Sequence, residues 1–343
     1  MAGVAGLLVA DATIVAGLVR TLERLKALQG AEGQIASNFE MRQGGAAPNA
    51  AAHVSFGSLA PRLDAATWYL VGVALAARAG ALDRETYRDS VRRVVHLLDA
   101  IEYNGRHLLY VPAGGNWADE YVYDGYILYD QVLRAWGLAL CARAFDEPAW
   151  DAKARAIGDR IGEAFAPAPD APRPHPPAAF SPLGVRDTFD LAGCALLALS
   201  GVAPSLGARA MDFVREAFVS HVALPPAFHP VIHEGDADWP ALARYHLHGF
   251  RNRPHEYHNG GVWPIWLGWL GLALAAHGRA DDLAALRRAT HARLAAAESF
   301  AFEEYLHGVT GQPLGTPHMA YTATGLVMLD VADAAGVRAM LVP

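Results

Sequence analysis

Three segments of the chain repeat one pattern, in which a tryptophan begins a run that is apolar on almost every face of a helix. The runs cover 68–80, 136–141 and 269–278. A helix that is apolar all round must be enclosed by other helices, whereas a helix with one polar face can lie at the surface. The two kinds alternate along this chain, which predicts stacked αα-hairpins with an inner ring of buried helices and an outer ring of amphipathic ones. An irregular all-α bundle is the alternative.

Helical periodicity dominates the rest of the sequence, and β-branched runs are few. Asp83 and Asp146 mark helix starts, and Gly80 and Gly278 mark helix ends. The candidate helices cover residues 6–29, 64–80, 84–103, 124–146, 148–166, 185–200, 206–221, 239–247, 262–277, 280–297 and 318–335. Since large barrels can form one domain at this length, we expect an all-α protein with a single domain over residues 1–343.

The composition excludes several classes of protein. Apolar residues make up 53% of the chain and charged residues 18%, the opposite of the balance that disorder needs. The net charge is −7, so no excess of cations can replace the counterions of a phosphate backbone, and we expect no nucleic-acid partner. Cys141 and Cys194 fall in apolar helical patterns and are expected to be buried thiols. The sequence has no CxxC pair, which excludes zinc ligation by thiolates.

The apolar N-terminus is interpreted as part of an amphipathic helix rather than a targeting segment. It lacks a basic start, contains Asp11 within the apolar stretch and continues into Arg20. No stretch of roughly 18 apolar residues is free of charges or breaks, so no membrane-spanning helix is expected. These features predict a soluble cytoplasmic protein with no membrane partner. The oligomeric state stays open, and a homo-oligomer is compatible with the sequence.

Four long loops carry many of the polar and aromatic residues outside the helices. They cover 30–63, 104–123, 222–261 and 298–317, and each lies just before an inner helix. Long ordered loops are usually functional. Loops that all precede inner helices would gather at one end of a ring, so we expect the functional site at that end.

The first loop ends at Arg62 and Asp64, just before the helix that contains Trp68. Arginine can donate hydrogen bonds to sugar hydroxyls, and aspartate can accept them. A helix-capping aspartate beside a surface arginine is the alternative, and taken alone it is the more common arrangement.

The second loop places two acids, Asp119 and Glu120, among aromatic residues that include Trp117 and Tyr123. Aromatic faces stack on the C–H surfaces of sugars, and a carboxylate among them loses water, which raises its pKa toward that of a useful general acid. A solvated pair of acids is the alternative. The aromatic density favours a function for Asp119 and, less strongly, for Glu120.

The third loop holds a cluster of histidines: His246, His248, His255 and His258. Their spacing does not match a zinc-binding helix motif, and no third ligand can be assigned, so we expect no metal. Hydrogen bonding of His258 and Asn259 to substrate hydroxyls is the preferred interpretation of this loop.

The fourth loop carries a second pair of acids, Glu303 and Glu304, again among aromatic residues. A pair of this kind is usually part of a solvated turn. Its position before an inner helix puts it on the same predicted rim as Asp119. The sequence therefore predicts a site with two carboxylates that only the fold can bring together.

Four stretches of the sequence resemble the six-hairpin, (α/α)6-barrel glycosidases. The likeness is to the neutral/alkaline invertases, the glucosidase domain of glycogen-debranching enzymes, and the processing α-glucosidase and glucosylglycerate hydrolase family. The most specific stretch is YHNGGVWP (257–264), which is close to the HNGGVWP stretch of the group. The others are SFGSLAPRLDAATWYL (55–70), NWADEYVYDGYILYDQVLRAWGLAL (116–140) and FEEYLHGVTGQPLG (302–315).

The resemblance implies an (α/α)6 toroid and an inverting glycoside hydrolase that acts on a small α-glycoside or an oligosaccharide without a cofactor. It implies that Asp119 is the general acid and Glu304 the general base, with their carboxyls roughly 6.5–9.5 Å apart to admit a water. The residues that it places in the sugar pocket are Arg62, Asp64, Trp68, Trp117, His258 and Trp263. We also expect substrate contacts from Glu120, Tyr123, Asn259, Glu303 and Tyr321. Tyr321 stands where the family has a tryptophan.

Two other functions stay open at this point. A sugar isomerase or 2-epimerase on a similar barrel would use histidines as proton-transfer bases. A non-catalytic carbohydrate-binding protein would keep the barrel without turnover. The groups at the centre of the pocket, two carboxylates or two histidines, distinguish the two enzymes, because the fold alone does not determine the chemistry.

Overall fold

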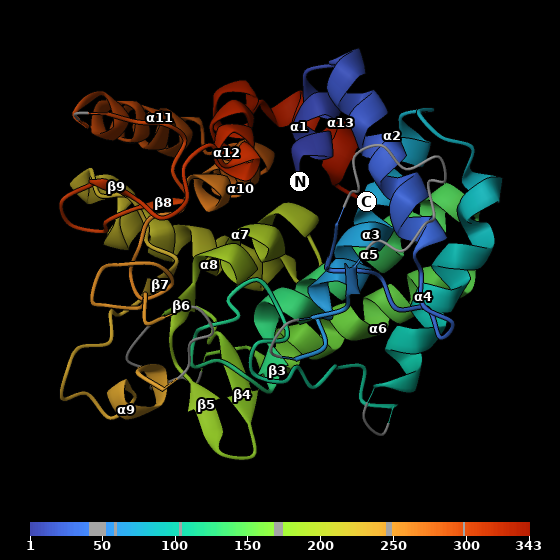
Figure 1. Ribbon diagram of the computed structural model, residues 1–343, viewed down its shortest axis with the longest axis horizontal. Helices are drawn as coiled ribbons and strands as arrows, with labels where there is room; N and C mark the ends of the chain where they lie inside the picture. The colour runs from blue at the N-terminus through green and yellow to red at the C-terminus, as the bar shows by residue number, and fades with distance from the viewer. Residues whose placement is uncertain (41–52, 58–59, 103–104, 168–173, 245–248, 298) are drawn as a thin grey trace.

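The computed structural model describes residues 1–343 except 41–52, 58–59, 103–104, 168–173, 245–248 and 298. Its helices form a closed (α/α)6 ring, as the alternating helix patterns predicted (Figure 1). The inner helices contact one another in cyclic order and are α1 (Ala2–Leu8), α3 (Asp64–Arg78), α5 (Leu128–Phe145), α7 (Leu191–Ser200), α10 (Pro264–Ala276) and α12 (Ala320–Val331). The outer helices are α2 (Ala12–Ala27), α4 (Arg88–Ala100), α6 (Pro148–Ala164), α8 (Pro204–Ala217), α11 (Ala280–Ala295) and α13 (Ala334–Leu341).

Short antiparallel strands join the loops that connect the helices. The pairs are β1 (Asn38–Phe39) with β2 (Val54–Ser55), β3 (Tyr126–Ile127) with β4 (Ala179–Ser181), β4 with β5 (Gly184–Arg186), β6 (Phe189–Asp190) with β7 (Phe228–His229), and β8 (Tyr305–Leu306) with β9 (Pro313–Leu314). The predicted helix 239–247 is reduced to α9 (Trp239–Leu242), and its residues 245–247 lie outside the described residues.

The predicted helix 6–29 is wrong, because it is two helices, α1 and α2. Ala10 between them has a φ of 53°, and the Asp11 carboxylate caps α2 by accepting from the N–H of Ile14 at 2.9 Å. A Cβ at Gly6 would lie 2.5 Å from the Ile14 side chain, so the glycine lets α1 lie against α2. The turn supplies the first hairpin of the ring.

Aspartate caps also change two other predicted boundaries. The predicted helix 318–335 is divided into α12 and α13, because the Asp333 carboxylate starts α13 by accepting from the N–H of Gly336 at 2.8 Å. The predicted helix 185–200 is shortened to α7, because its first residues form β5 and the Asp190 side chain caps α7. These caps supply the last hairpin and fix where an inner helix begins.

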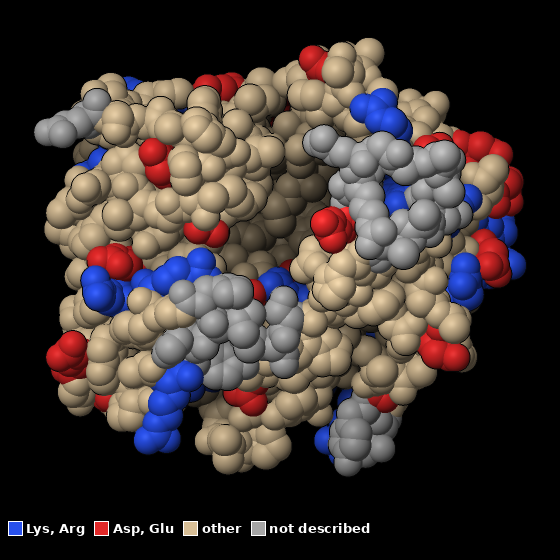
Figure 2. All heavy atoms as spheres, viewed as in Figure 1, with Lys and Arg blue, Asp and Glu red and all other residues tan. Residues whose placement is uncertain are grey.

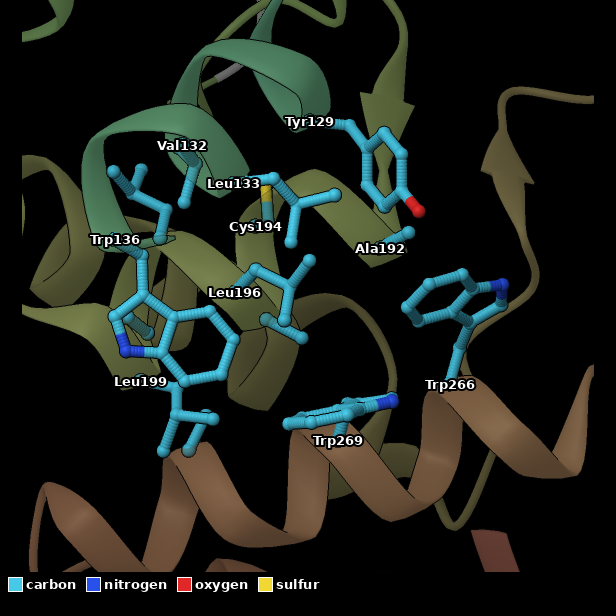
Figure 3. Close-up of a cluster of buried hydrophobic side chains, with 14 of the residues drawn as sticks. Tyr129, Val132, Leu133, Trp136, Ala192, Cys194, Leu196, Leu199, Trp266 and Trp269 are labelled. Atoms are coloured by element: carbon cyan, nitrogen blue, oxygen red, sulfur yellow. The ribbon is translucent and has the colours of Figure 1, made fainter. Parts of the chain in front are cut away.

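The repeated tryptophans meet inside the ring. The ring centroids of Trp68 and Trp136 are 6.3 Å apart, those of Trp68 and Trp269 are 5.3 Å apart, and those of Trp136 and Trp269 are 6.0 Å apart. Figure 3 shows Trp136, Trp269 and Trp266 in a buried apolar cluster with leucines of α5 and α7. Such burial of large aromatic surface is the main stabilising term for the ring.

Two predictions about the chain as a whole can be compared with the structure. Cys141 and Cys194 are buried free thiols, as expected. Among the described residues, every helix is too short or too polar to span a bilayer. Figure 2 shows that basic side chains (Lys and Arg) and acidic side chains (Asp and Glu) are scattered together over one face of the molecule.

Candidate active site

A cavity of about 330 Å³ opens at the end of the ring where the inner helices begin. Figure 2 shows a hollow near the centre of this face. The lining residues are Met1, Arg62, Asp64, Trp117, Asp119, Tyr257, Trp263, Ile265, Trp266, Glu304 and Tyr321. Each of the four long loops contributes to this wall, so the loops gather at one end of the ring as the sequence predicted.

The carboxylates of Asp119 and Glu304 line the same cavity, although they lie far apart in the sequence. A third carboxylate, that of Asp64, lines it from the first turn of α3. None of the described lining residues is a histidine. Among the described lining residues, carboxyl groups and not imidazoles are therefore available for proton transfer.

The charge of Asp119 is balanced between two opposing effects. Its carboxylate forms an ion pair with Arg62, and each of the two side chains is about one-quarter exposed or less. Burial raises the pKa of Asp119, the positive charge of Arg62 opposes this rise, and the neighbouring Glu120 adds to it, so that the pKa lies above its usual value. Burial also raises the pKa of Asp64 to about 6, again against Arg62. Burial thus raises the pKa of both carboxyl groups, and the positive charge of Arg62 opposes the rise in each of them.

Glu304 lies just before β8 and has a different kind of environment. Burial and the negative charge of Glu304 raise the pKa of the neighbouring Tyr321 hydroxyl, and Oε2 of Glu304 is 3.5 Å from the backbone nitrogen of Thr316. Gly315 has a φ of 84°, and a Cβ there would lie 2.7 Å from the Cβ and Oε2 of Glu304. The loop backbone at Gly315 and Thr316 therefore limits where this carboxylate can lie.

Aromatic rings supply flat apolar surface around these carboxylates. Trp117 stacks on Phe228 with ring centroids 5.7 Å apart and meets Trp263 edge-on at 5.6 Å. Trp263 is stacked with Tyr321 at 6.2 Å and an interplanar angle of 16°. Rings arranged in this way can cover the C–H faces of a sugar while the polar groups contact its hydroxyls.

Glu120 does not line the cavity. It is buried and forms a two-point ion pair with Arg251, in which Nη2 lies 2.8 Å from Oε1 and Nε lies 3.2 Å from Oε2. The side-chain amide of Asn252 donates to the backbone oxygen of Glu120 at 2.6 Å, and the Arg251 guanidinium lies 4.1 Å from the centroid of the Tyr257 ring. This pair joins the second loop to the third. No motif surrounds Arg251, so the sequence does not predict its role.

Three other predicted binding residues are also buried in the wall. The Tyr123 hydroxyl donates to Asp190 at 2.9 Å, and the Asn259 amide bonds the backbone N–H and C=O of Ile232 at 2.8 Å each. His258 is fully buried, and neither of its ring nitrogens has a hydrogen-bond partner within the described part of the chain. Burial holds the pKa of His258 well below its usual value, so the ring is neutral. These three side chains therefore lie behind the residues that line the cavity.

Glu303 faces a second cavity of about 430 Å³, which lies between the end of α11 and β9. Its carboxylate accepts the N–H of Ala301 at 2.8 Å. Trp68 belongs to the tryptophan core of the ring. The cavity at the loop end brings together the predicted residues Arg62, Asp64, Trp117, Asp119, Trp263, Glu304 and Tyr321. It does not include Trp68, Glu120, Tyr123, His258, Asn259 or Glu303.

The histidines of the third loop form no metal site that the structure describes. No group of three or more His, Cys, Asp or Glu side chains among the described residues could hold a metal ion. The ring centroid of His255 is 5.7 Å from that of His233 and 5.9 Å from that of His307. His246 and His248 lie outside the described residues.

No family model and no curated protein matches the sequence. The structure is similar to that of the GH63 mannosylglycerate hydrolase from Thermus thermophilus in complex with Tris and D-glycerate, with 12% identity, a TM-score of 0.61, and 95% of this chain and 91% of that chain covered. It is similar to a rhamnosidase from Klebsiella oxytoca with rhamnose bound, with 12% identity, a TM-score of 0.59, and 91% and 53% covered. It is also similar to the family 8 endoglucanase Cel10 from Klebsiella pneumoniae, with 12% identity, a TM-score of 0.51, and 91% and 90% covered. The ring therefore has the six-hairpin fold that these glycoside hydrolases share.

Proposed function

We propose that the protein is an inverting glycoside hydrolase that acts on a small α-glycoside or an oligosaccharide. The observation that carries the proposal is that Asp119 and Glu304, from two distant loops, line one cavity between tryptophan and tyrosine rings. The fold supports it, since its structural neighbours include a mannosylglycerate hydrolase solved with glucose and a rhamnosidase solved with rhamnose.

Asp119 is the general acid in this proposal. Burial raises the pKa of Asp119 and so favours the protonated carboxyl that a general acid needs. The proton passes to the glycosidic oxygen as the bond from that oxygen to the anomeric carbon breaks. A substrate hydroxyl or ring oxygen near Arg62 would compete with Asp119 for the guanidinium, and this competition would favour protonation further.

Glu304 is the general base. Its carboxylate takes a proton from a water while the oxygen of that water bonds to the anomeric carbon on the face opposite the leaving group. The product sugar then has the inverted configuration. Asp119 is left ionised and Glu304 protonated, and proton exchange with solvent restores the starting state.

A non-catalytic carbohydrate-binding protein is the second candidate, and one observation favours it. The ion pair between Arg62 and Asp119 stabilises the ionised form of Asp119, which cannot donate a proton. A sugar isomerase or epimerase finds less support, because no histidine is among the described residues that line the cavity.

A glycoside screen tests the proposal. The purified protein is incubated with α- and β-linked disaccharides and aryl glycosides, and NMR records which anomer of the product forms first. We expect hydrolysis of an α-glycoside with inversion, and we expect Asp119→Asn and Glu304→Gln to abolish most of it. Full activity in both variants would refute the assignment, and saturable binding of sugars without turnover would support the binding protein.

A further inference from the structure

Asp119 and Glu120 are the two central residues of a β-turn in the second loop. The N–H of Tyr121 donates to the backbone oxygen of Ala118 at 3.1 Å and closes this turn. The Asp119 side chain lines the cavity, whereas the Glu120 side chain is 2% exposed and does not line it. The two carboxylates therefore leave the turn on different sides.

Two asparagine side chains hold the backbone of this turn. The side-chain oxygen of Asn116 accepts from the N–H of Ala118 at 3.1 Å, and the side-chain amide of Asn252 donates to the backbone oxygen of Glu120 at 2.6 Å. Turns of types I and II place their end residues alike and differ in the orientation of the central peptide, which here joins Asp119 to Glu120. The two backbone bonds alone therefore do not fix the directions of the central side chains.

The Arg251 side chain holds Glu120 from the third loop. Its Nη2 lies 2.8 Å from Oε1 of Glu120 and its Nε lies 3.2 Å from Oε2, so the planar guanidinium meets both carboxylate oxygens. A two-point bond of this kind fixes the direction of a carboxylate as well as its distance. The guanidinium also lies 4.1 Å from the ring centroid of Tyr257, which is 5% exposed and lines the cavity. The Glu120 side chain is therefore tied to a buried part of the cavity wall.

We propose that Arg251 is a positioning residue for Asp119: by holding Glu120 at two points on one side of the turn, it keeps the carboxyl group of Asp119 directed into the cavity. This inference rests on the proposed hydrolase function, in which Asp119 protonates the leaving group. Arg251 does not line the cavity, and it neither gives nor takes a proton. Since it acts through the turn, its loss should impair the step that needs Asp119 and no other step.

The test compares two glycosides of the sugar that the screen identifies. An alkyl glycoside releases an alcohol, whose oxygen must be protonated as the bond breaks, whereas a dinitrophenyl glycoside releases a stable anion that needs no acid. For Arg251→Gln we expect kcat to fall about 10- to 100-fold on the alkyl glycoside and less than about threefold on the dinitrophenyl glycoside. Equal losses on both substrates, or no loss on either, overturn the inference.

Arg251→Lys is a second variant, in case Arg251→Gln does not fold. Lysine keeps the positive charge beside Glu120 but lacks the planar fork that contacts both carboxylate oxygens. We expect a smaller loss than in Arg251→Gln, again on the alkyl glycoside. Full activity of Arg251→Lys on that substrate would mean that the charge, rather than the two-point geometry, is what the turn needs, and would overturn the positioning role.

Arg88→Gln is the matched control. Arg88 also forms a two-point ion pair, in which Nε lies 2.7 Å from Oε2 of Glu85 and Nη2 lies 2.8 Å from Oε1, and its guanidinium lies 5.4 Å from the ring centroid of Phe145. Arg88 begins the outer helix α4 and does not line the cavity. We expect this variant to keep kcat within about twofold on both substrates. A loss confined to the alkyl glycoside and equal to that of Arg251→Gln would overturn the inference.

Asp119→Asn separates this inference from the function on which it rests. We expect its loss of kcat to be larger on the alkyl glycoside than on the dinitrophenyl glycoside, and we expect Arg251→Gln to add no further loss to it on the alkyl glycoside. If Asp119→Asn distinguishes the two substrates but Arg251→Gln does not, or if the double variant is slower than Asp119→Asn, only the inference is overturned. Full activity of Asp119→Asn on the alkyl glycoside overturns the proposed function itself.

Discussion

Two pairs of adjacent acids, Asp119–Glu120 and Glu303–Glu304, each contribute one residue to the cavity, and the surroundings of the two pairs differ. In each pair one acid lines the cavity and the other turns away. Glu120 turns into a buried ion pair with Arg251, whereas Glu303 turns into an open polar cavity and bonds a single backbone N–H. Glu120 is therefore buried within the fold, whereas Glu303 lies beside an open cavity.

The difference also holds for the two acids that line the cavity. Asp119 lies between buried neighbours, with Ala118 and Glu120 each 1% exposed, and its charge is set by Arg62 and by burial. Glu304 lies between the half-buried Glu303 and Tyr305, which is 5% exposed; it forms no ion pair among the described residues, and the backbone of Gly315 approaches it closely. Changes near Asp119 should therefore act through charge and stability, and changes near Glu304 through geometry.

The largest expected effect tests which member of each pair does chemistry. We expect Asp119→Asn and Glu304→Gln to lower kcat about 10²- to 10⁴-fold, the usual contribution of a general acid or base. We expect Glu303→Gln to keep its activity, because its side chain lies outside the cavity. Steady-state kinetics on the screened substrate measure all three, and a loss in Glu303→Gln equal to that in Glu304→Gln would break the distinction within the second pair.

The next effect is on stability and distinguishes Glu120 from Glu303, the two acids that do not line the cavity. Glu120→Ala leaves the Arg251 guanidinium half-buried without its carboxylate, so we expect the free energy of unfolding to fall by about 3–4 kcal/mol. Glu303→Ala removes one bond at an open cavity, and we expect a loss below about 1 kcal/mol. Urea denaturation followed by circular dichroism measures both, and equal losses would contradict the comparison.

How far the sequence predicts the structure of a segment depends on whether the apolar residues of that segment recur with a regular period. In the helices around Trp68, Trp136 and Trp269, apolar residues recur at every turn, so the burial of these helices in a ring could be predicted. The turn between α1 and α2 could not, because it contains neither glycine nor proline and its one signal is Asp11 as a helix cap.

Loops have no such period, which explains why some residues predicted to bind substrate lie outside the cavity. Aromatic density pointed to the segments of Asp119 and Glu304, both of which line the cavity, but nothing in a loop sequence says which of two adjacent acids faces inward. Glu120 and Glu303 were assigned to the substrate for that reason. Arg251 was missed because its partner, Glu120, is joined to it only by the fold.

A pH-dependent effect on stability sharpens the description of the Asp119 side. Burial raises the pKa of Asp64 to about 6, so the folded protein binds a proton that the unfolded chain releases near pH 4. Asp64 therefore lowers the stability progressively as pH rises from about 4 to about 6, by roughly 3 kcal/mol in all. The free energy of unfolding of Asp64→Asn, minus that of the native protein, should grow by about 2 kcal/mol between roughly pH 4.5 and 7, since the first part of the loss falls below that range. A difference that stays flat with pH would show that the charge of Asp64 has no such effect.

The smallest effect concerns geometry on the Glu304 side. Gly315→Ala would place a Cβ 2.7 Å from the Cβ and Oε2 of Glu304, so we expect the carboxylate to be displaced and kcat to fall about tenfold. The matched control is Gly80→Ala, because Gly80 has a φ of 68° and no atom lies within 4 Å of the position that its Cβ would take. Both variants should lose about 1 kcal/mol of stability from a left-handed backbone, but only the first should lose activity. If Gly80→Ala lost as much activity as Gly315→Ala, backbone strain and not the approach to Glu304 would explain the result, and the geometric account of the base would be wrong.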